Sequence, residues 1–278
     1  MRSARCYNCD TEARTFYANE NGYSLVKCGG CGLLYVKNPP SLGELEKAHA
    51  QGQHAGERTI EATGHYKPLA CKRYVAILKE LYGDGIDDGV AWLDVGCGHG
   101  EFMVALAKFC PASVEIVGSE PNIHKQASAR GRGLNVRFVD LDQEDRKYDF
   151  ISLLNVYSHL PDPPSFIAKL RALLKPNGGL LIETGDTADL SADEHYRPFS
   201  LPDHLSFASE KIVTDILQRL DFEVEAVRKY PYLRVDAVTF GRELLKFFLP
   251  GYDSRLTDIL QARNRYPTTD MYIRARKK

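Results

Sequence analysis

Apolar and polar positions alternate along the chain in two distinct rhythms from Val90 onward. Short continuous apolar runs are typical of buried strands, and apolar residues at every third or fourth position are typical of helices. The two kinds of segment follow one another in turn, which predicts an α/β fold with helices on both faces of a mainly parallel sheet. The expected strands are residues 90–95, 114–119, 136–139, 148–154, 178–184, 222–230 and 270–276. The expected helices are residues 101–110, 121–130, 164–176 and 209–220.

The first 88 residues follow a different pattern. Residues 1–40 contain two closely spaced cysteine pairs and end in Asn-Pro-Pro, which stops regular structure. Residues 41–88 are expected to be helical, because apolar residues recur there at helical spacing: Leu69, Tyr74, Ile77, Leu78 and Leu81. We therefore predict a metal-binding ribbon over 1–40, a helical connecting segment over 41–88, and an α/β domain over 89–278 with an insertion at 230–270.

Four of the seven cysteines form two C-x-x-C pairs, Cys6 with Cys9 and Cys28 with Cys31. Disulfides are rare in reducing compartments, and a two-residue spacing presents two thiolates to one metal ion. Four thiolates complete a closed tetrahedral site, which is the pattern of structural zinc. A rubredoxin-like iron site uses the same four sulfurs and stays open as an alternative. The metal is expected to stabilise a segment that is too short to fold on its own core.

The bulk composition is that of an ordinary globular protein. Of 278 residues, 44% are hydrophobic and 26% are charged, and the formal net charge is −1. This charge lacks the basic excess that is typical of nucleic-acid binding. No apolar run approaches the roughly 20 residues that span a bilayer, and the N-terminus lacks the apolar core of a signal peptide. We therefore expect a cytoplasmic protein without a membrane partner; the composition leaves the oligomeric state open.

The stretch LDVGCGHGEF, residues 93–102, places three glycines at alternate positions between the first strand and the first helix of the α/β domain. Glycines in such a turn let a ligand approach backbone N–H groups and the helix N-terminus, at the sheet edge where this kind of fold binds ligands. The spacing is G-x-G-x-G, which differs from the G-x-G-x-x-G of dinucleotide-binding folds. A tight turn that binds nothing is the alternative.

Two carboxylates near this turn favour one ligand. Asp94 precedes Gly96 by two residues, where it would repel a pyrophosphate and attract an ammonium or a sulfonium group. Glu120 ends the second strand, where a carboxylate can accept hydrogen bonds from a ribose diol. An amino acid, a sulfonium and a ribose together describe S-adenosylmethionine.

Residues 90–230 resemble a class I S-adenosylmethionine-dependent methyltransferase. The resemblance rests on LDVGCGHGEF, GSEP, FVDLD, DFISLLNVYSHLPDP and LLKPNGGLLIET, in the order and at the spacing of that family. It implies a Rossmann-like sheet of seven strands in the order 3-2-1-4-5-7-6, with an antiparallel last strand at residues 270–276. It also implies an enzyme that transfers a methyl group from S-adenosylmethionine.

The resemblance implies a role for each residue at a matching position. Asp94, Gly96 and Gly98 would line the methionine part of the cofactor, and Glu120 would hold the ribose hydroxyls. The other implied cofactor-binding residues are Pro121, Asp140 and Leu141 around the adenine, and Asn155 and Val156 at the reacting end.

The combination of cysteine pairs and methyltransferase motifs resembles two families with different acceptors. One comprises sugar and other small-molecule methyltransferases with an N-terminal zinc segment, and the other comprises ribosomal-RNA guanine methyltransferases with a zinc ribbon. Residues 1–37 carry five Lys or Arg and three Asp or Glu, and a zinc tetrathiolate adds negative charge, so this segment suits phosphates poorly. The prediction is a small-molecule acceptor; ribosomal RNA, or a catalytically inactive cofactor-binding module, remain the alternatives.

Methyl transfer to a hydroxyl or a carbon acid usually needs a base, and histidine is the commonest base at neutral pH. The candidates are His159 in NVYSHLPDP, which follows the fourth strand, and His195 and His204, which follow the fifth strand. The acceptor pocket is expected to involve that first stretch, the loop 184–207 and the insertion 230–270, all near the carboxyl edge of the sheet.

Overall fold

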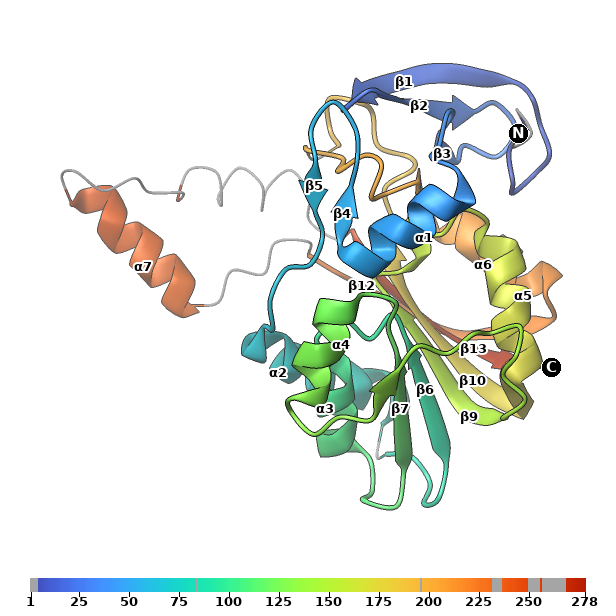
Figure 1. The fold of residues 1–278 in the computed structure, drawn as a ribbon, viewed down its shortest axis with the longest axis vertical. Helices are drawn as coiled ribbons and strands as arrows, with labels where there is room; N and C mark the ends of the chain where they lie inside the picture. The colour runs from blue at the N-terminus through green and yellow to red at the C-terminus, as the bar shows by residue number, and fades with distance from the viewer. Residues whose placement is uncertain (1–4, 84, 196, 232–236, 250–255, 257–268) are drawn as a thin grey trace.

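The computed structural model describes residues 5–83, 85–195, 197–231, 237–249, 256 and 269–278. Its centre is a seven-stranded sheet with the order β12-β13-β10-β9-β6-β7-β8 (Figure 1). The strands are β6 (Ala91–Val95), β7 (Glu115–Ser119), β8 (Val136–Arg137), β9 (Tyr148–Leu154), β10 (Leu174–Gly185), β12 (Phe222–Tyr230) and β13 (Asp270–Lys277). Strands β6 to β10 pair in parallel, and β13 runs antiparallel to both β10 and β12. The predicted α/β fold and its antiparallel strand are confirmed.

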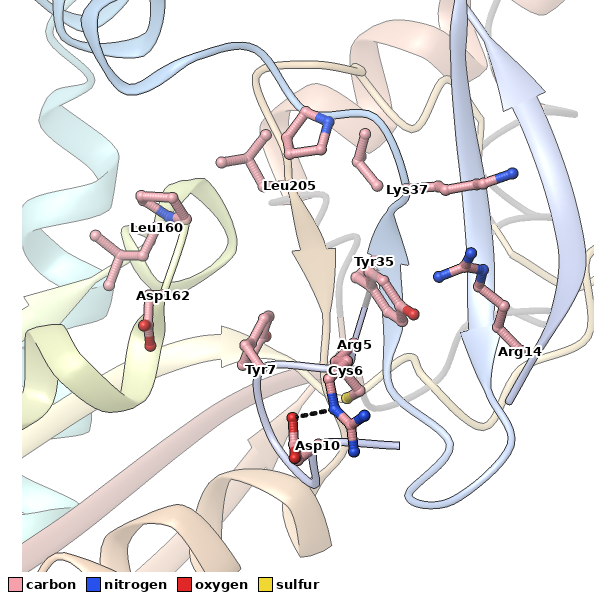
Figure 2. A pocket seen from close by; sticks show the side chains of 13 residues that line it. Arg5, Cys6, Tyr7, Asp10, Arg14, Tyr35, Lys37, Leu160, Asp162 and Leu205 are labelled. Atoms are coloured by element: carbon pink, nitrogen blue, oxygen red, sulfur yellow. Dashed lines mark hydrogen bonds and ion pairs between the residues drawn. The ribbon is translucent and has the colours of Figure 1, made fainter. Parts of the chain in front are cut away.

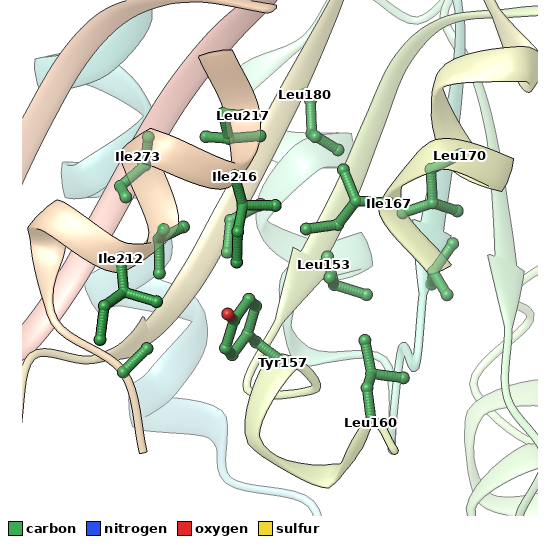
Figure 3. Packing of buried hydrophobic residues seen from close by; sticks show 14 of the residues in the cluster. Leu153, Tyr157, Leu160, Ile167, Leu170, Leu180, Ile212, Ile216, Leu217 and Ile273 are labelled. Carbon is green, nitrogen blue, oxygen red and sulfur yellow. The ribbon is translucent and has the colours of Figure 1, made fainter. Parts of the chain in front are cut away.

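Helices cover both faces of this sheet. Along β6, Trp92 belongs to the cluster under α2 (Pro68–Tyr82) and α3 (Glu101–Phe109), while Leu93 points to the opposite face. That opposite face is covered by α5 (Pro163–Leu173) and α6 (Glu210–Arg219). Figure 3 shows Ile167 of α5 and Ile216 of α6 packed over Leu153 of β9. Asp162 begins α5 by accepting a hydrogen bond from the Ser165 N–H group, ahead of prolines that suit the first turn.

The cysteine-containing segment forms a second sheet with part of the α/β domain. Strands β1 (Arg14–Glu20), β2 (Tyr23–Cys28) and β3 (Leu34–Val36) are joined by β11 (Ser206–Phe207), which follows β10 in the chain. The Val36 N–H group donates to the Leu205 carbonyl at 2.9 Å, and the Tyr7 hydroxyl donates to Ser206 Oγ at 2.9 Å. The segment therefore shares its packing with the loop that carries two of the candidate histidines.

The connecting segment is less helical than its sequence predicts. Helix α1 (Leu42–Gln51) begins with a capping box between Ser41 and Glu44 and ends at Gly52, whose φ is +71°. The short strands β4 (Gln53–His54) and β5 (Ile60–Glu61) pair before α2 begins. The predicted apolar face of α2 is confirmed at Ile77, Leu78 and Leu81, which are buried, whereas Leu69 is exposed.

The remaining elements concern the ends of the sheet. Helix α4 (Ile123–Arg130) follows β7, and β8 covers only two of the four residues expected at 136–139, because its pairing with β7 ends at Arg137. Helix α7 (Ala237–Phe248) lies in the insertion 230–270, most of which falls outside the described residues, including Tyr232 and Tyr252. Among the helices that the structure describes, none combines the length and the apolar character needed to cross a bilayer.

Candidate functional site

The glycine turn lies between β6 and α3 and adopts the backbone conformation that glycine favours. Gly96 has a φ of +69° and Gly98 a φ of +57°. Both lie in the left-handed region, where a residue with a side chain is strained. A Cβ atom on Gly96 would lie 2.3 Å from Cγ2 of Val156, so Val156 from the end of β9 contacts the turn directly. The N–H groups of Gly96 and Cys97 both donate to the Ser119 carbonyl, at 2.7 and 3.0 Å. These bonds hold the turn against the end of β7.

Asp94 lies within β6 and is 2% exposed. Its Oδ1 atom accepts a hydrogen bond from Ser152 Oγ at 2.6 Å, and the Trp92 indole N–H donates to the same hydroxyl at 3.0 Å. Burial raises the pKa of Asp94 to about 7, and the hydrogen bond from Ser152 acts in the opposite direction. A cationic ligand group beside this carboxylate would favour its ionised form.

Glu120 follows β7 and joins the glycine turn to α4. Its Oε2 atom accepts the Gly98 N–H at 2.8 Å, and its Oε1 atom accepts the Asn122 N–H at 2.9 Å. The residue is 4% exposed. An ionised carboxylate offers about four acceptor positions, so both oxygens keep capacity for further donors. The backbone bonds therefore fix the carboxylate in one orientation and leave it able to bind a diol.

The other predicted cofactor residues lie on loops that follow the same strand ends. Pro121 follows Glu120 directly, and Asp140 and Leu141 follow β8. Asp140 is exposed and accepts the Asp142 N–H at 3.0 Å. Asn155, also exposed, has a φ of +55° and donates its N–H to the Glu183 carbonyl at 3.2 Å.

His159 lies in a short 3-10 helix, Tyr157–His159, just beyond β9. Its Nδ1 atom lies 3.0 Å from Oδ1 of Asp203 and 2.8 Å from the Asp203 carbonyl oxygen. Burial acts to lower the pKa of His159, but the Asp203 carboxylate outweighs it and the pKa is raised overall. Because Nδ1 is engaged by Asp203, Nε2 is the nitrogen available to a substrate.

The other two candidate histidines have different surroundings. The His204 ring lies 4.7 Å from the His159 ring, and burial lowers the pKa of His204 to about 4, with His159 acting in the same direction. His195 is 2% exposed, and its ring lies 4.9 Å from both Phe199 and Phe207. His195 is thus enclosed by aromatic rings, while His159 and His204 form a pair.

The sequence pattern missed three residues near this pair. Asp203 immediately precedes His204 in a polar loop, and no motif marks it. His54 comes from β4, and its Nε2 atom lies 3.1 Å from Oδ1 of Asp203. The His49 ring of α1 lies 5.4 Å from the His54 ring. No periodicity links residues about 100 to 150 positions apart, so only the fold reveals this group.

The four cysteines of the two pairs converge. Their Sγ atoms all lie within 4.8 Å of one another, with Cys6 and Cys31 at 3.6 Å and Cys9 and Cys28 at 3.4 Å. Sulfurs bound to one zinc ion at about 2.3 Å in a tetrahedron lie about 3.8 Å apart. The four thiols therefore lie close enough together to be ligands of one tetrahedral metal ion.

A cavity of about 290 Å³ lies between the cysteine segment and the turn after the 3-10 helix (Figure 2). Tyr7 and Tyr35 line the side that belongs to the cysteine segment, and Leu160 and Leu205 line the side that belongs to the α/β domain. Leu160 follows His159 in the chain, and Leu205 follows His204. The cavity thus adjoins both segments that carry the histidine pair.

Comparison with known protein families matches residues 64–227, more than half of the chain, to a family described as a methyltransferase domain. The ubiquinone biosynthesis O-methyltransferase of Actinobacillus pleuropneumoniae serotype 7 is 34% identical over 106 residues, covering 33% of this chain and 44% of that protein. The malonyl-[acyl-carrier protein] O-methyltransferase of Halalkalibacterium halodurans is 31% identical over 134 residues, covering 45% and 49%. The chain therefore spans less than half of the length of each of these relatives.

Solved structures share the fold at low sequence identity. Phospholethanolamine N-methyltransferase 2 of Haemonchus contortus aligns with a TM-score of 0.53 and 17% identity, over 74% of this chain and 52% of that one. Coclaurine N-methyltransferase aligns with a TM-score of 0.51 and 15% identity, over 74% and 72%. The family match covers the glycine turn and the ends of β7 and β9. The chain belongs to the methyltransferase-domain family.

Proposed function

We propose that this protein transfers a methyl group from S-adenosylmethionine to a small-molecule acceptor. The observation that supports this most is the joint placement of two buried carboxylates at the glycine turn. Asp94 precedes the turn, and Glu120 is hydrogen-bonded to Gly98 within it. One carboxylate suits a cationic amino-acid end and the other a ribose diol, as a nucleoside sulfonium requires.

The proposed cofactor contacts follow from these positions. Asp94, Gly96 and Gly98 would hold the methionine part, and Glu120 would accept the ribose hydroxyls. Pro121, Asp140 and Leu141 would bound the adenine, and Asn155 and Val156 would face the reacting end. When bound, S-adenosylmethionine supplies an electrophilic methyl group. This chain's own residues orient it and keep the acceptor within near-attack distance.

In this proposal His159 is the general base for the acceptor. The Asp203 carboxylate and carbonyl hold the Nδ1 proton, so Nε2 presents its lone pair. The same carboxylate stabilises the imidazolium that forms when Nε2 takes the acceptor's proton. His204 lies beside it, and His195 packs against Phe199 and Phe207 in the same loop.

The proposed acceptor is a small organic molecule. The relatives named above include O-methyltransferases of ubiquinone biosynthesis and of malonyl-[acyl-carrier protein]. The cavity in Figure 2 offers Tyr7 and Tyr35 as flat walls and Leu160 and Leu205 as apolar contacts for such a molecule. Two of the three stretches predicted for the acceptor pocket contribute to this cavity.

We place the protein in the cytoplasm, where thiols stay reduced.

We further propose that Cys6, Cys9, Cys28 and Cys31 hold one structural zinc ion. All four ligand positions would be filled by thiolates, which leaves no position for a substrate. The ion would fix residues 5–36 as one wall of the acceptor cavity, because β3 pairs with β11 and Tyr7 bonds to Ser206.

The proposal is tested by incubating the protein with methyl-labelled S-adenosylmethionine and separate pools of small metabolites and of ribosomal RNA. Mass spectrometry should find the label in a small molecule, and His159→Ala should lower that transfer about 100-fold or more without changing cofactor affinity. Label in RNA alone would contradict the acceptor class. Cofactor binding without transfer to either pool would favour the inactive-module alternative.

A further inference from the structure

Two histidines from distant segments share one oxygen of Asp203. Oδ1 lies 3.0 Å from Nδ1 of His159 and 3.1 Å from Nε2 of His54. His159 follows β9, Asp203 precedes β11, and His54 belongs to β4 in the connecting segment. The carboxylate therefore bridges the α/β domain and the segment before it.

The shared oxygen determines where both rings carry their protons. A carboxylate oxygen accepts, so His159 donates from Nδ1 and His54 donates from Nε2. This leaves the lone pair of neutral His159 on Nε2, the nitrogen that faces away from Asp203. The Asp203 carbonyl oxygen also accepts the Nδ1 proton, at 2.8 Å, so the carboxylate is one of two acceptors at Nδ1. Without a second donor the carboxylate could rotate away from Nδ1, and the His54 N–H opposes that rotation.

His54 is well placed to be that second donor. It is 1% exposed, and its Nδ1 atom is buried without a hydrogen-bond partner among the described residues. Asp203 is therefore the polar partner of the His54 ring in the part of the chain that the structure describes. Burial and the adjacent His49 ring limit how the imidazole can turn.

The connecting segment is itself tied to the cofactor turn. His99, within the glycine turn, lies with Nε2 2.9 Å from the Thr63 carbonyl and Nδ1 2.8 Å from Ser128 Oγ. The Ala62 N–H donates to the Gly52 carbonyl at 2.8 Å, which closes the loop that contains His54. His54 is thus held by the same segment that contacts the glycine turn.

We propose that His54 is a positioning residue for methyl transfer: it locks the Asp203 carboxylate, which in turn orients His159. This inference rests on the proposed role of His159. On this account the connecting segment contributes to catalysis through His54, which acts on His159 by way of Asp203 and not by direct contact with cofactor or acceptor. The charged and titratable groups around the cluster are His49 of α1, Lys125 of α4, His195 and His204.

The first test is histidine NMR on the full chain, which reports ring tautomers without a substrate. In the wild type, neutral His159 should carry its proton on Nδ1. In His54→Phe, which keeps the ring contact with His49 and removes the donor, the Nδ1 proton should keep only the Asp203 carbonyl as a fixed acceptor, and the Nε2-protonated tautomer should gain population. The pKa of His159 should fall part of the way toward the value it has in Asp203→Asn, because the Asp203 charge stays nearby but is less well aligned. A retained Nδ1 tautomer with an unchanged or higher pKa would overturn the proposal.

Two further variants separate positioning from folding. His54→Gln places an amide N–H near the Nε2 position and should restore the Nδ1 tautomer. His54→Asn is polar but too short to do so, and it should behave like His54→Phe even if the phenylalanine variant folds poorly. His65→Gln, at an exposed histidine of the same segment, is the matched control and should change nothing.

Turnover distinguishes this inference from the proposed function. With an acceptor found by labelled transfer, His54→Phe should lower kcat about tenfold or more with little change in KM, and His54→Gln should restore it. If His159→Ala lowers turnover and His54→Phe does not, the positioning role is wrong and the proposed function stands. If neither does, His159 is not the base.

Discussion

The Ser152 hydroxyl donates a hydrogen bond of 2.6 Å to Oδ1 of Asp94 inside the core, where Asp94 is 2% exposed. The two residues are register partners on β6 and β9, so the sheet itself sets this contact. Burial raises the pKa of Asp94 to about 7, although the hydrogen bond from Ser152 acts to lower it. Asp94 is therefore a carboxyl group whose charge depends on pH near neutrality.

This predicts that cofactor binding depends on pH. A cationic methionine end favours ionised Asp94, so binding releases a proton at low pH. With a pKa of about 7, affinity for S-adenosylmethionine should rise about eightfold between pH 6 and pH 7.5. The stability of the unliganded chain should change in the opposite direction. Because the pKa of Asp94 is higher in the folded chain than in the unfolded one, folding stability falls as the pH rises from about 3.8 to about 7. Calorimetry at several pH values and in two buffers measures both the affinity and the proton release.

Asp94→Asn is the control for this pH dependence. It should bind the cofactor more weakly and remove the dependence between pH 6 and pH 7.5. Ser152→Ala should shift the dependence to higher pH, because it removes the hydrogen bond that lowers the pKa of Asp94. An unchanged pH profile in Asp94→Asn would exclude Asp94 as its source.

Glu120→Ala should weaken cofactor binding by about tenfold or more. Hydrogen bonds to a charged group contribute roughly 1.5–3 kcal/mol each, and the substitution removes one or two from the ribose. Glu120→Gln keeps the side-chain length and should lose less. Because Glu120 also accepts the Gly98 and Asn122 N–H groups, both variants need a melting curve beside the calorimetry. Equal affinity in wild type and Glu120→Ala would remove Glu120 from the ribose site.

Gly96→Ala should destabilise the chain and abolish tight cofactor binding. A side chain in the left-handed region costs roughly 1–2 kcal/mol, and the new Cβ would lie 2.3 Å from Val156 Cγ2. Gly43→Ala is the matched control, since nothing lies within 4 Å of its Cβ position in α1. That variant should be neutral or more stable by roughly 0.5–1 kcal/mol. Equal denaturation midpoints in the two variants would mean that the turn tolerates a side chain.

Metal analysis should find about one zinc ion per chain, and Cys28→Ser should lose it. The seven-stranded sheet should stay folded, because residues outside 5–36 supply most of its buried core. The β3–β11 pairing should loosen, so hydrogen exchange should rise at Ser206 and Phe207 and methyl transfer should fall. Cys110→Ser, at a half-buried cysteine outside the cluster, is the control and should keep the metal. Stoichiometric iron, or full metal content in Cys28→Ser, would contradict this assignment.

The sequence predicts the central fold well because most strands of the sheet have a strong local signal; the two-residue β8 is the exception. Apolar runs such as Ala91–Val95 and Tyr148–Leu154 are long enough to be recognised as strands from the sequence. The pairs Gln53–His54 and Ser206–Phe207 are strands of two residues, which carry no measurable period. Ser206–Phe207 becomes a strand by pairing with Leu34 and Tyr35, far away in the chain, so no local pattern could reveal it. The expected helix over 41–88 ends early at Gly52, which takes the left-handed conformation of a helix C-cap.

The candidate site divides in a similar way. Residues that act within one turn, such as Gly96, Gly98 and the neighbouring Asp94, are visible as a short motif. Asp203 and His54 reach the site through tertiary folding, and the residues next to them in the chain form no motif that predicts it. His195 illustrates the converse, since a histidine in a polar loop proves to be 2% exposed and packed against Phe199 and Phe207.

The crystal structure of the chain with S-adenosylhomocysteine tests the central claim most directly. The account predicts the ribose hydroxyls within hydrogen-bond distance of Glu120, the amino-acid end beside Asp94 and the Gly96 turn, and the sulfur directed toward Val156 and His159. A ligand bound elsewhere, or one whose ribose makes no contact with Glu120, would contradict it.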